Sequence, residues 1–146
     1  MTHIIAIRQW LNPGSAAGEI LILSEPLSFW GGFDPVHGTI VDHRHPQRGA
    51  CVAGKVLVMP GSRGSAGTPA AIAEAIRRDT GPVAVLLGNT DANIAIGAMV
   101  ADRLYGGTTP VLVVGPEDDP RLRTGDEIAI AADGSVTADS LPGPTD

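Results

Sequence analysis

The chain has 146 residues, of which 43% are hydrophobic, 18% charged and 3% aromatic, with 19 glycines and 12 prolines. This composition can bury a core, yet no apolar run approaches the ~20 residues of a membrane span, so we expect one turn-rich soluble domain with no membrane partner. A formal net charge of −6 provides no basic surface for nucleic acid.

The cysteine content and the start of the chain predict a cytoplasmic protein. Cys51 is the single cysteine, so the chain forms no intrachain disulfide framework and cannot hold a zinc ion or an iron–sulfur cluster by itself. The first residues lack the basic stretch and the long apolar run of a secretory signal. We therefore expect a reducing compartment.

Short apolar runs between glycines and prolines predict strands in the first half of the chain. They cover Ile4–Ile7, Glu19–Ser24 and Cys51–Met59, and the second run is apolar on both faces, which indicates a buried strand. Cys51 is interpreted as a small buried hydrophobic residue at the start of the third strand. Residues 27–50 show little periodicity, and a loop of this length is usually functional or covers another part of the domain.

The second half of the chain alternates helices and strands. Thr68 is the predicted N-cap and Pro69 the first residue of a helix that reaches Arg78. Asp91 completes the cap of a second helix, Ala92–Tyr105, which a pair of glycines terminates.

Strands are also predicted on both sides of this second helix. They cover Val83–Leu87 and Val111–Val114, and this order indicates a parallel pair joined by a right-handed crossover. The dipeptide Asp133-Gly134 predicts a hairpin between Glu127–Ala131 and Ser135–Ala138. The fold class is therefore α/β, with a small layer of parallel strands, two helices and flanking β-strands. We expect one domain over residues 1–140 and a flexible C-terminal tail at 141–146.

The loop Pro60–Gly67 is the strongest candidate for a binding site. Its three glycines let a ligand approach the backbone, and the helix after it offers unpaired N–H groups and the positive end of its dipole, so an anion is favoured here. Arg63 adds paired donors for a carboxylate or phosphate, and Ser62 and Ser65 add hydroxyls. The spacing matches neither a P-loop nor a dinucleotide fingerprint. A turn in which glycine and serine only relieve backbone strain remains the alternative.

The segment Glu25–Pro35 gathers aromatic residues beside the pair Gly31-Gly32. Aromatic residues are scarce in this chain, so their clustering favours an interface with another chain or the wall of an active site. Packing against the domain's own core is the alternative.

Three histidines, His37, His43 and His45, lie close to Asp42 in the sequence. In an extended chain His43 and His45 would point to the same side, but Arg44 between them opposes a metal cation. We therefore expect hydrogen-bonded structural roles for the histidines and no metal site.

These segments, taken in order, resemble the small subunit of aconitase X. The resemblance covers residues 17–114 and rests on Glu-Pro-Leu-Ser-Phe-Trp-Gly-Gly-Phe-Asp-Pro (25–35), Ile-Val-Asp (40–42), His-Pro (45–46), Ala-Gly-Lys-Val-Leu-Val-Met-Pro (53–60) and Arg-Gly-Ser (63–65). It implies an aconitase-swivel-like β/β/α domain that closes over an iron–sulfur cluster held by a larger subunit. This chain itself would bind no cofactor or metal.

The resemblance also implies an activity and a set of site residues. The family dehydrates small hydroxy acids, either cis-3-hydroxy-L-proline or 5-phosphomevalonate, and we favour the first because only Arg63 and Lys55 are candidates for holding a phosphate. The general base of the family corresponds to Ser65. Substrate contacts are expected from Ser62, Arg63, Gly64, Gly31 and Gly32.

Two other classes of function remain alternatives. In the first, the chain is a non-catalytic binding or assembly module that uses the same glycine-rich loop to hold an anionic metabolite or a partner. A self-sufficient serine hydrolase is disfavoured because the chain lacks G-x-S-x-G and any recognisable context for a catalytic triad.

Overall fold

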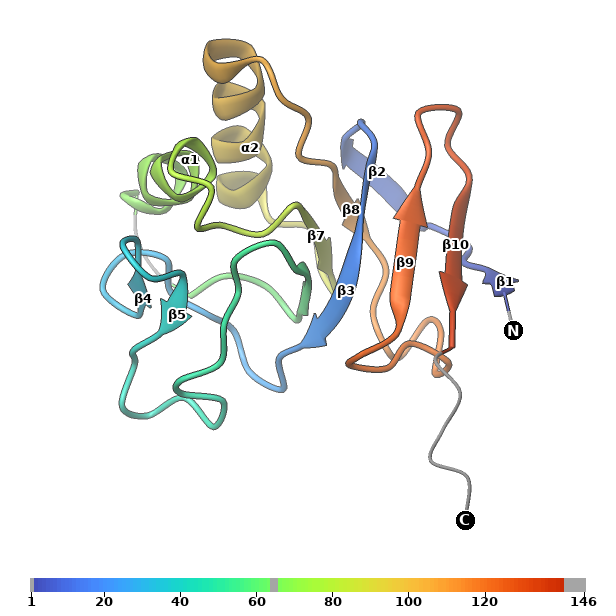
Figure 1. Ribbon diagram of the computed structural model, residues 1–146, viewed down its shortest axis with the longest axis horizontal. Helices are drawn as coiled ribbons and strands as arrows, with labels where there is room; N and C mark the ends of the chain where they lie inside the picture. The colour runs from blue at the N-terminus through green and yellow to red at the C-terminus, as the bar shows by residue number, and fades with distance from the viewer. Residues whose placement is uncertain (1, 64–65, 141–146) are drawn as a thin grey trace.

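The computed structural model describes residues 2–63 and 66–140, which contain ten strands and two helices (Figure 1). Eight of the strands form one mixed sheet in the order β1-β10-β9-β3-β6-β7-β8-β2, and β4 pairs with β5 in a separate ribbon. In chain order the elements are β1 (Thr2–Ile4), β2 (Gln9–Asn12), β3 (Ala16–Ile22), β4 (Phe33–Asp34), β5 (Thr39–Ile40), β6 (Val56–Met59), α1 (Thr68–Arg77), β7 (Ala84–Leu87), α2 (Ala92–Tyr105), β8 (Val111–Val113), β9 (Glu127–Ile130) and β10 (Val136–Asp139).

The parallel strands β3, β6, β7 and β8 form the middle layer of the domain. All residues of β6, β7 and β8 are buried, because α1 and α2 cover one face and the β9–β10 hairpin covers the other. In β6, Leu57 and Met59 join the core under the helices, while Val56 and Val58 join the core under the hairpin. Figure 1 shows this order of layers, with the helices and the hairpin on opposite sides of β6–β8. The predicted β/β/α architecture is confirmed.

The two helices pack closely because α2 carries a glycine where it meets α1. A Cβ atom on Gly97 would lie 2.7 Å from the carbonyl oxygen of Pro69 and would overlap the side chain of Ile72. Only glycine fits at this contact. The helices of the described residues are too short or too polar to cross a membrane.

Several predicted elements agree with the structure. Asp91 caps α2 through hydrogen bonds from the backbone N–H groups of Asn93 and Ile94, and Gly106 ends the helix in the left-handed conformation at φ 80°. Strands β7 and β8 are parallel neighbours. Strands β9 and β10 pair as the predicted antiparallel hairpin, in which Gly134 has φ 94°.

The prediction for the start of the first helix was wrong. Gly67 is the N-cap and Thr68 is already the first helical residue, without a side-chain capping hydrogen bond. Thr68 therefore lies one position past the N-cap, and its buried hydroxyl has no hydrogen-bond partner among the described residues.

The predicted first strand was also misplaced. Ile4–Ile7 spans the turn between two shorter strands, β1 and β2, which lie at opposite edges of the sheet. Strand β1 pairs with β10 and β2 with β8, so long-range pairing sets the boundaries. Strand β3 begins at Ala16 rather than Glu19. Of its residues Ile20 is buried, Ala17 and Glu19 are exposed, and the rest are half-buried, so the prediction of a fully buried strand was wrong.

Cys51 is exposed, contrary to the predicted buried position. The regular strand begins only at Val56, and Cys51 makes an isolated bridge to Thr39 instead. Val52, the next residue, occupies the core position. The region 27–50, predicted as an irregular loop, contains the short β4–β5 ribbon. The tail predicted at 141–146 lies outside the described residues.

Candidate functional site

The candidate loop follows β6 at the carboxyl edge of the parallel strands. Ser62 forms a parallel bridge with Leu27, and the backbone N–H of Arg63 donates to the Leu27 carbonyl oxygen at 3.1 Å. The loop therefore lies directly beside the aromatic segment. Gly64 and Ser65, the predicted substrate-binding glycine and general base, lie outside the described residues.

Asp91 holds the beginning of this loop. Its Oδ2 atom accepts hydrogen bonds from the Ser62 backbone N–H at 2.7 Å and from the Ser62 hydroxyl at 2.5 Å. Its Oδ1 atom accepts from the N–H groups of Asn93 and Ile94 at 3.1 and 3.4 Å, which caps α2. One carboxylate thus joins the loop after β6 to the helix after β7. The hydroxyl proton of Ser62 is used in this contact, and its lone pairs remain available to a ligand.

The far end of the loop enters α1. The N-cap Gly67 provides no side-chain oxygen to the first turn, and Pro69 has no N–H group. The Thr68 hydroxyl is buried and has no hydrogen-bond partner among the described residues. The positive end of the α1 dipole therefore faces the loop without a neutralising acidic side chain in the first turn.

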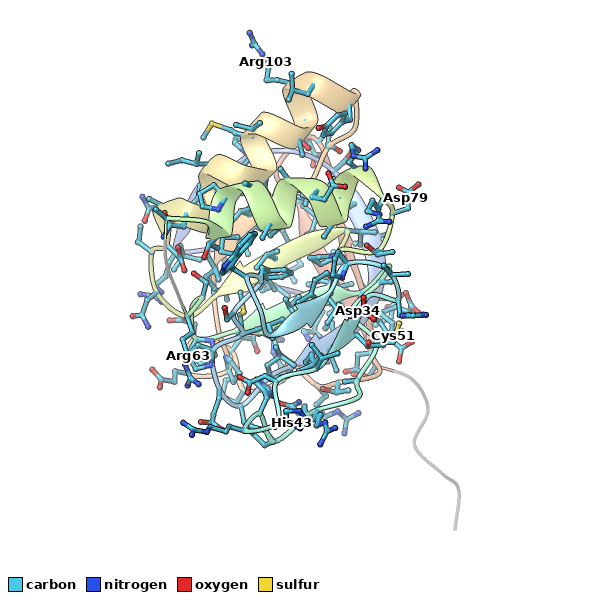
Figure 2. All side chains as sticks on the ribbon, turned by 90° about the vertical axis from the view of Figure 1, so that its left-hand side faces the viewer. Asp34, His43, Cys51, Arg63, Asp79 and Arg103 are labelled. Carbon is cyan, nitrogen blue, oxygen red and sulfur yellow. The ribbon has the colours of Figure 1, made fainter. Side chains whose placement is uncertain are left out.

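Arg63 lies at the surface beside Glu25. Its guanidinium lies 3.9 Å from a carboxylate oxygen of Glu25, and the two side chains are 53% and 48% exposed. An exposed pair of this kind contributes at most about 1 kcal/mol, so Arg63 can exchange Glu25 for a ligand carboxylate at little cost. In Figure 2 Arg63 lies on the left side of the molecule, below the helices, and Cys51 and Asp34 lie on the right side.

The backbone conformation and the close packing of the aromatic segment explain why glycine occupies positions 31 and 32. Gly31 has φ 95°, a conformation that favours glycine, and no atom lies within 4 Å of where its Cβ would be. A Cβ on Gly32 would lie 2.7 Å from the Ser28 carbonyl oxygen. The Gly32 carbonyl accepts from the N–H groups of Val41 and Asp42 at 3.0 and 3.3 Å. Gly31 is therefore the more open of the two glycines toward a ligand.

A hollow of about 250 Å³ opens at the carboxyl ends of the parallel strands, next to Pro60. This edge of an α/β sheet is where ligands usually bind. Asp118 lines the hollow, but its carboxylate already accepts from the Gly115 N–H at 2.9 Å and from Arg8 at 3.1 Å. The hollow is otherwise largely apolar, with Leu23 and Met59 in its wall.

The histidines do not come together as a metal site. His45 is buried, its Nε2 lies 3.1 Å from the Glu25 carbonyl oxygen, and its Nδ1 accepts from the Gln47 N–H at 3.0 Å, which confirms a structural role. His37 hydrogen-bonds to Asp34 at 2.6 Å, and this contact lowers the pKa of the Asp34 carboxyl. His43 is exposed on the lower part of the face in Figure 2. Residues 2–63 and 66–140 contain no group of three His, Cys, Asp or Glu side chains with the geometry of a metal site.

The sequence profile of the aconitase X swivel domain matches residues 5–138. The chain belongs to this family. The matched residues include the loop after β6 and both residues that hold it, Asp91 and Leu27.

Relatives and a solved structure agree with this assignment. Over 117 residues the chain is 39% identical to a cis-3-hydroxy-L-proline dehydratase of Pseudomonas aeruginosa, covering 80% of this chain but only 20% of that protein. Over 91 residues it is 38% identical to a phosphomevalonate dehydratase small subunit of Methanothermobacter thermautotrophicus, covering 62% and 70% of the two chains. The crystal structure of Thermococcus kodakaraensis aconitase X in its holo-form superposes with a TM-score of 0.77 at 30% identity, covering 90% and 95%. The chain spans about a fifth of the hydroxyproline dehydratase that it matches.

Sequence reasoning missed the second role of Asp91. The pattern Asn-Thr-Asp before an apolar helix predicts a cap, and it does not indicate that the same carboxylate reaches Ser62, 29 residues earlier. The available signal is topological, because loops after neighbouring parallel strands meet at one edge of the sheet.

Proposed function

We propose that this chain is the small subunit of an aconitase X dehydratase and carries its general base on the loop between β6 and α1. The observation that carries the proposal is the anchoring of this loop by Asp91 and Leu27 beside the first turn of α1. The family assignment and the names of the relatives support a hydro-lyase.

In this proposal Ser65 removes a proton from the substrate carbon next to a carboxylate. An alkoxide-like serine needs nearby positive charge, which the N-terminus of α1 and Arg63 supply. Arg63 also binds the substrate carboxylate. Ser62, Gly64, Gly31 and Gly32 complete the substrate surface with backbone groups and one hydroxyl.

The residues of this chain do not fit an iron–sulfur cluster. Cluster ligands are usually several cysteine thiolates, whereas Cys51 is the single cysteine and lies exposed on the edge of the face opposite Arg63 (Figure 2). We assign the cluster to a larger aconitase X subunit, and the small subunit alone is expected to be inactive.

The proposed substrate is cis-3-hydroxy-L-proline, with 5-phosphomevalonate as the second candidate. Lys55 and Arg63 are the two candidate cations for a phosphate. Lys55 directly precedes β6, whereas the loop follows β6, so Lys55 lies at the other end of that strand. It also pairs with Glu19 at 3.8 Å. Arg63 then remains as the cation of the loop itself, which suits a substrate with one carboxylate better than a phosphorylated one.

Reconstitution with the larger aconitase X subunit of the same organism tests the proposal. We expect dehydration of cis-3-hydroxy-L-proline by the pair and none by either subunit alone. Ser65→Ala should lower kcat about 10²- to 10⁴-fold, the usual contribution of a general base. Ser135→Ala, on the distant β9–β10 hairpin, is the matched control. Undiminished activity of Ser65→Ala would show that Ser65 is not the general base. Activity only on 5-phosphomevalonate would show that this compound, and not cis-3-hydroxy-L-proline, is the substrate.

A further inference from the structure

The aromatic segment carries exposed side chains that the proposed chemistry does not use, because only the backbone of Gly31 and Gly32 is assigned to the substrate. Trp30 is 67% exposed, and beside it lies a hollow of about 370 Å³ between the segment and α1. We call this surface the Trp30 hollow; its lining includes Phe29, Trp30, Phe33, Pro35, Ala71 and Glu74.

Hydrogen bonds fix the backbone on either side of the exposed Trp30. The Ser28 hydroxyl donates to the Trp30 carbonyl oxygen at 2.7 Å, and the Gly32 N–H donates to the Ser28 carbonyl oxygen at 3.1 Å. Phe29 and Phe33 on either side are buried and pack together, with ring centroids 5.1 Å apart. Trp30 is therefore exposed on an ordered backbone, which is the usual condition of an interface anchor.

The chemistry of the hollow selects an apolar occupant. Its one charged lining residue, Glu74, is already paired with Arg77 through two hydrogen bonds of 2.9 and 2.5 Å. The other lining groups are aromatic rings, a proline ring, a glycine and two alanines of α1. The short side chains of Ala70 and Ala71 leave room above the helix for a side chain from another protein.

We propose that the Trp30 hollow is the docking site for the larger aconitase X subunit, with an apolar side chain of that subunit seated against Trp30. This inference rests on the proposed function. The Leu27–Ser62 bridge places the hollow's segment beside the candidate loop, so a protein that closes over the loop covers the same face. The hydroxyproline dehydratase relative supplies the second argument: the matched region is 20% of its length, so in that protein a much larger remainder shares one polypeptide with the region that matches this chain.

A second apolar surface offers a matched control. On α2, Ile96, Met99, Val100 and Leu104 are 43–66% exposed, and the helix runs away from Asp91 and the loop toward Tyr105. Leu104, at 66%, is as exposed as Trp30 and lies near the end of α2 far from the loop. Its truncation removes a comparable apolar contact from a different place.

The test is the affinity of the 146-residue chain for the purified larger subunit, measured by isothermal titration calorimetry. Trp30→Ala should bind about 30-fold more weakly, as truncation of a central tryptophan anchor does. Ala70→Arg, which places a charged chain over the hollow on an exposed helical position, should weaken binding to a similar extent. Leu104→Ala should bind like the wild type. Circular dichroism of each variant verifies its fold.

Kinetics separate docking from catalysis. Raising the concentration of the larger subunit should restore the kcat of Trp30→Ala, whereas Ser65→Ala should bind normally and stay slow at saturation. Unchanged affinity of both Trp30→Ala and Ala70→Arg would overturn this docking site while leaving the proposed function intact. Weaker binding by Leu104→Ala alone would move the interface to α2. A wild-type chain that does not bind the larger subunit would overturn the proposed function together with this surface.

Discussion

One carboxylate oxygen of Asp91 accepts both the backbone N–H and the hydroxyl of Ser62, at 2.7 and 2.5 Å. The other oxygen caps α2. The start of the candidate loop and the start of the second helix therefore form one hydrogen-bonded unit. If the loop moved away from α2, the hydrogen bonds between Ser62 and Asp91 would break. The position of the loop is therefore tied to the start of the helix that follows β7.

Replacement of Asp91 separates these two roles. Asp91→Ala removes the cap and leaves the donors of Ser62 unpaired, so the free energy of unfolding should fall by about 1–3 kcal/mol. Asp91→Asn keeps a good capping residue and should lose less. Urea denaturation of both variants and of Ser62→Ala, which removes only the hydroxyl contact, measures the difference. Equal stability of Asp91→Ala and the wild type would contradict this account.

Gly97, the glycine within α2, should tolerate replacement poorly. In Gly97→Ala the new methyl group would press on the Pro69 carbonyl and on Ile72, and overpacking of this kind costs about 1–3 kcal/mol. Gly107→Ala is the control, because no atom lies within 4 Å of its Cβ position. Thermal unfolding should give a clearly lower Tm for Gly97→Ala and little change for Gly107→Ala. Equal Tm values for the two variants would show that α1 and α2 can move apart to accommodate the added methyl group at no cost in stability.

The Asp119–Arg121 contact predicts part of the pH dependence of stability. The Arg121 side chain donates to Asp119 at 2.9 and 2.8 Å, and these hydrogen bonds lower the pKa of the Asp119 carboxyl below its ordinary value of 3.8. A carboxyl whose pKa is lower in the folded state binds its proton more readily when unfolded. Its stabilisation is therefore present above the ordinary pKa and is lost as the pH falls through the folded-state value.

Thermal unfolding across pH tests this sign. Asp119→Asn should have a lower Tm than the wild type between about pH 5 and 7, and the two curves should approach each other as the pH falls below about 3. Arg121→Gln should behave in the same way because it removes the donor. A Tm difference that stays constant down to pH 2 would show that packing, and not ionisation, explains the loss.

The parts of the fold that local signals determine were predictable. Helix α2, its Asp91 cap and its Gly106 terminus follow from residues adjacent in sequence, as does the hairpin at Gly134. The exposure of Cys51 and the division of Ile4–Ile7 depend on pairing with distant strands, which local patterns do not encode.

The candidate site shows the same division. Glycine content and the family resemblance locate the loop and Arg63, because a ligand-binding turn needs those residue types within one short segment. The contact from Asp91 to Ser62 and the bridge from Leu27 join residues 29 and 35 positions apart. Periodicity and spacing carry no information about such contacts, so only the arrangement of the parallel strands reveals them.

Arg63 should act in substrate binding and contribute little to folding. Its exposed pairing with Glu25 at 3.9 Å is weak, so Arg63→Ala should change the free energy of unfolding by less than about 0.5 kcal/mol. Loss of a charge-assisted hydrogen bond to the substrate carboxylate should raise KM about 10- to 100-fold in the complex with the larger subunit. Glu25→Gln is the matched control: it frees Arg63 from its partner and should leave KM unchanged or lower it. If steady-state kinetics give the same KM for Arg63→Ala and the wild type, the substrate carboxylate is bound elsewhere, and Arg63 only contributes charge to the surface of this chain.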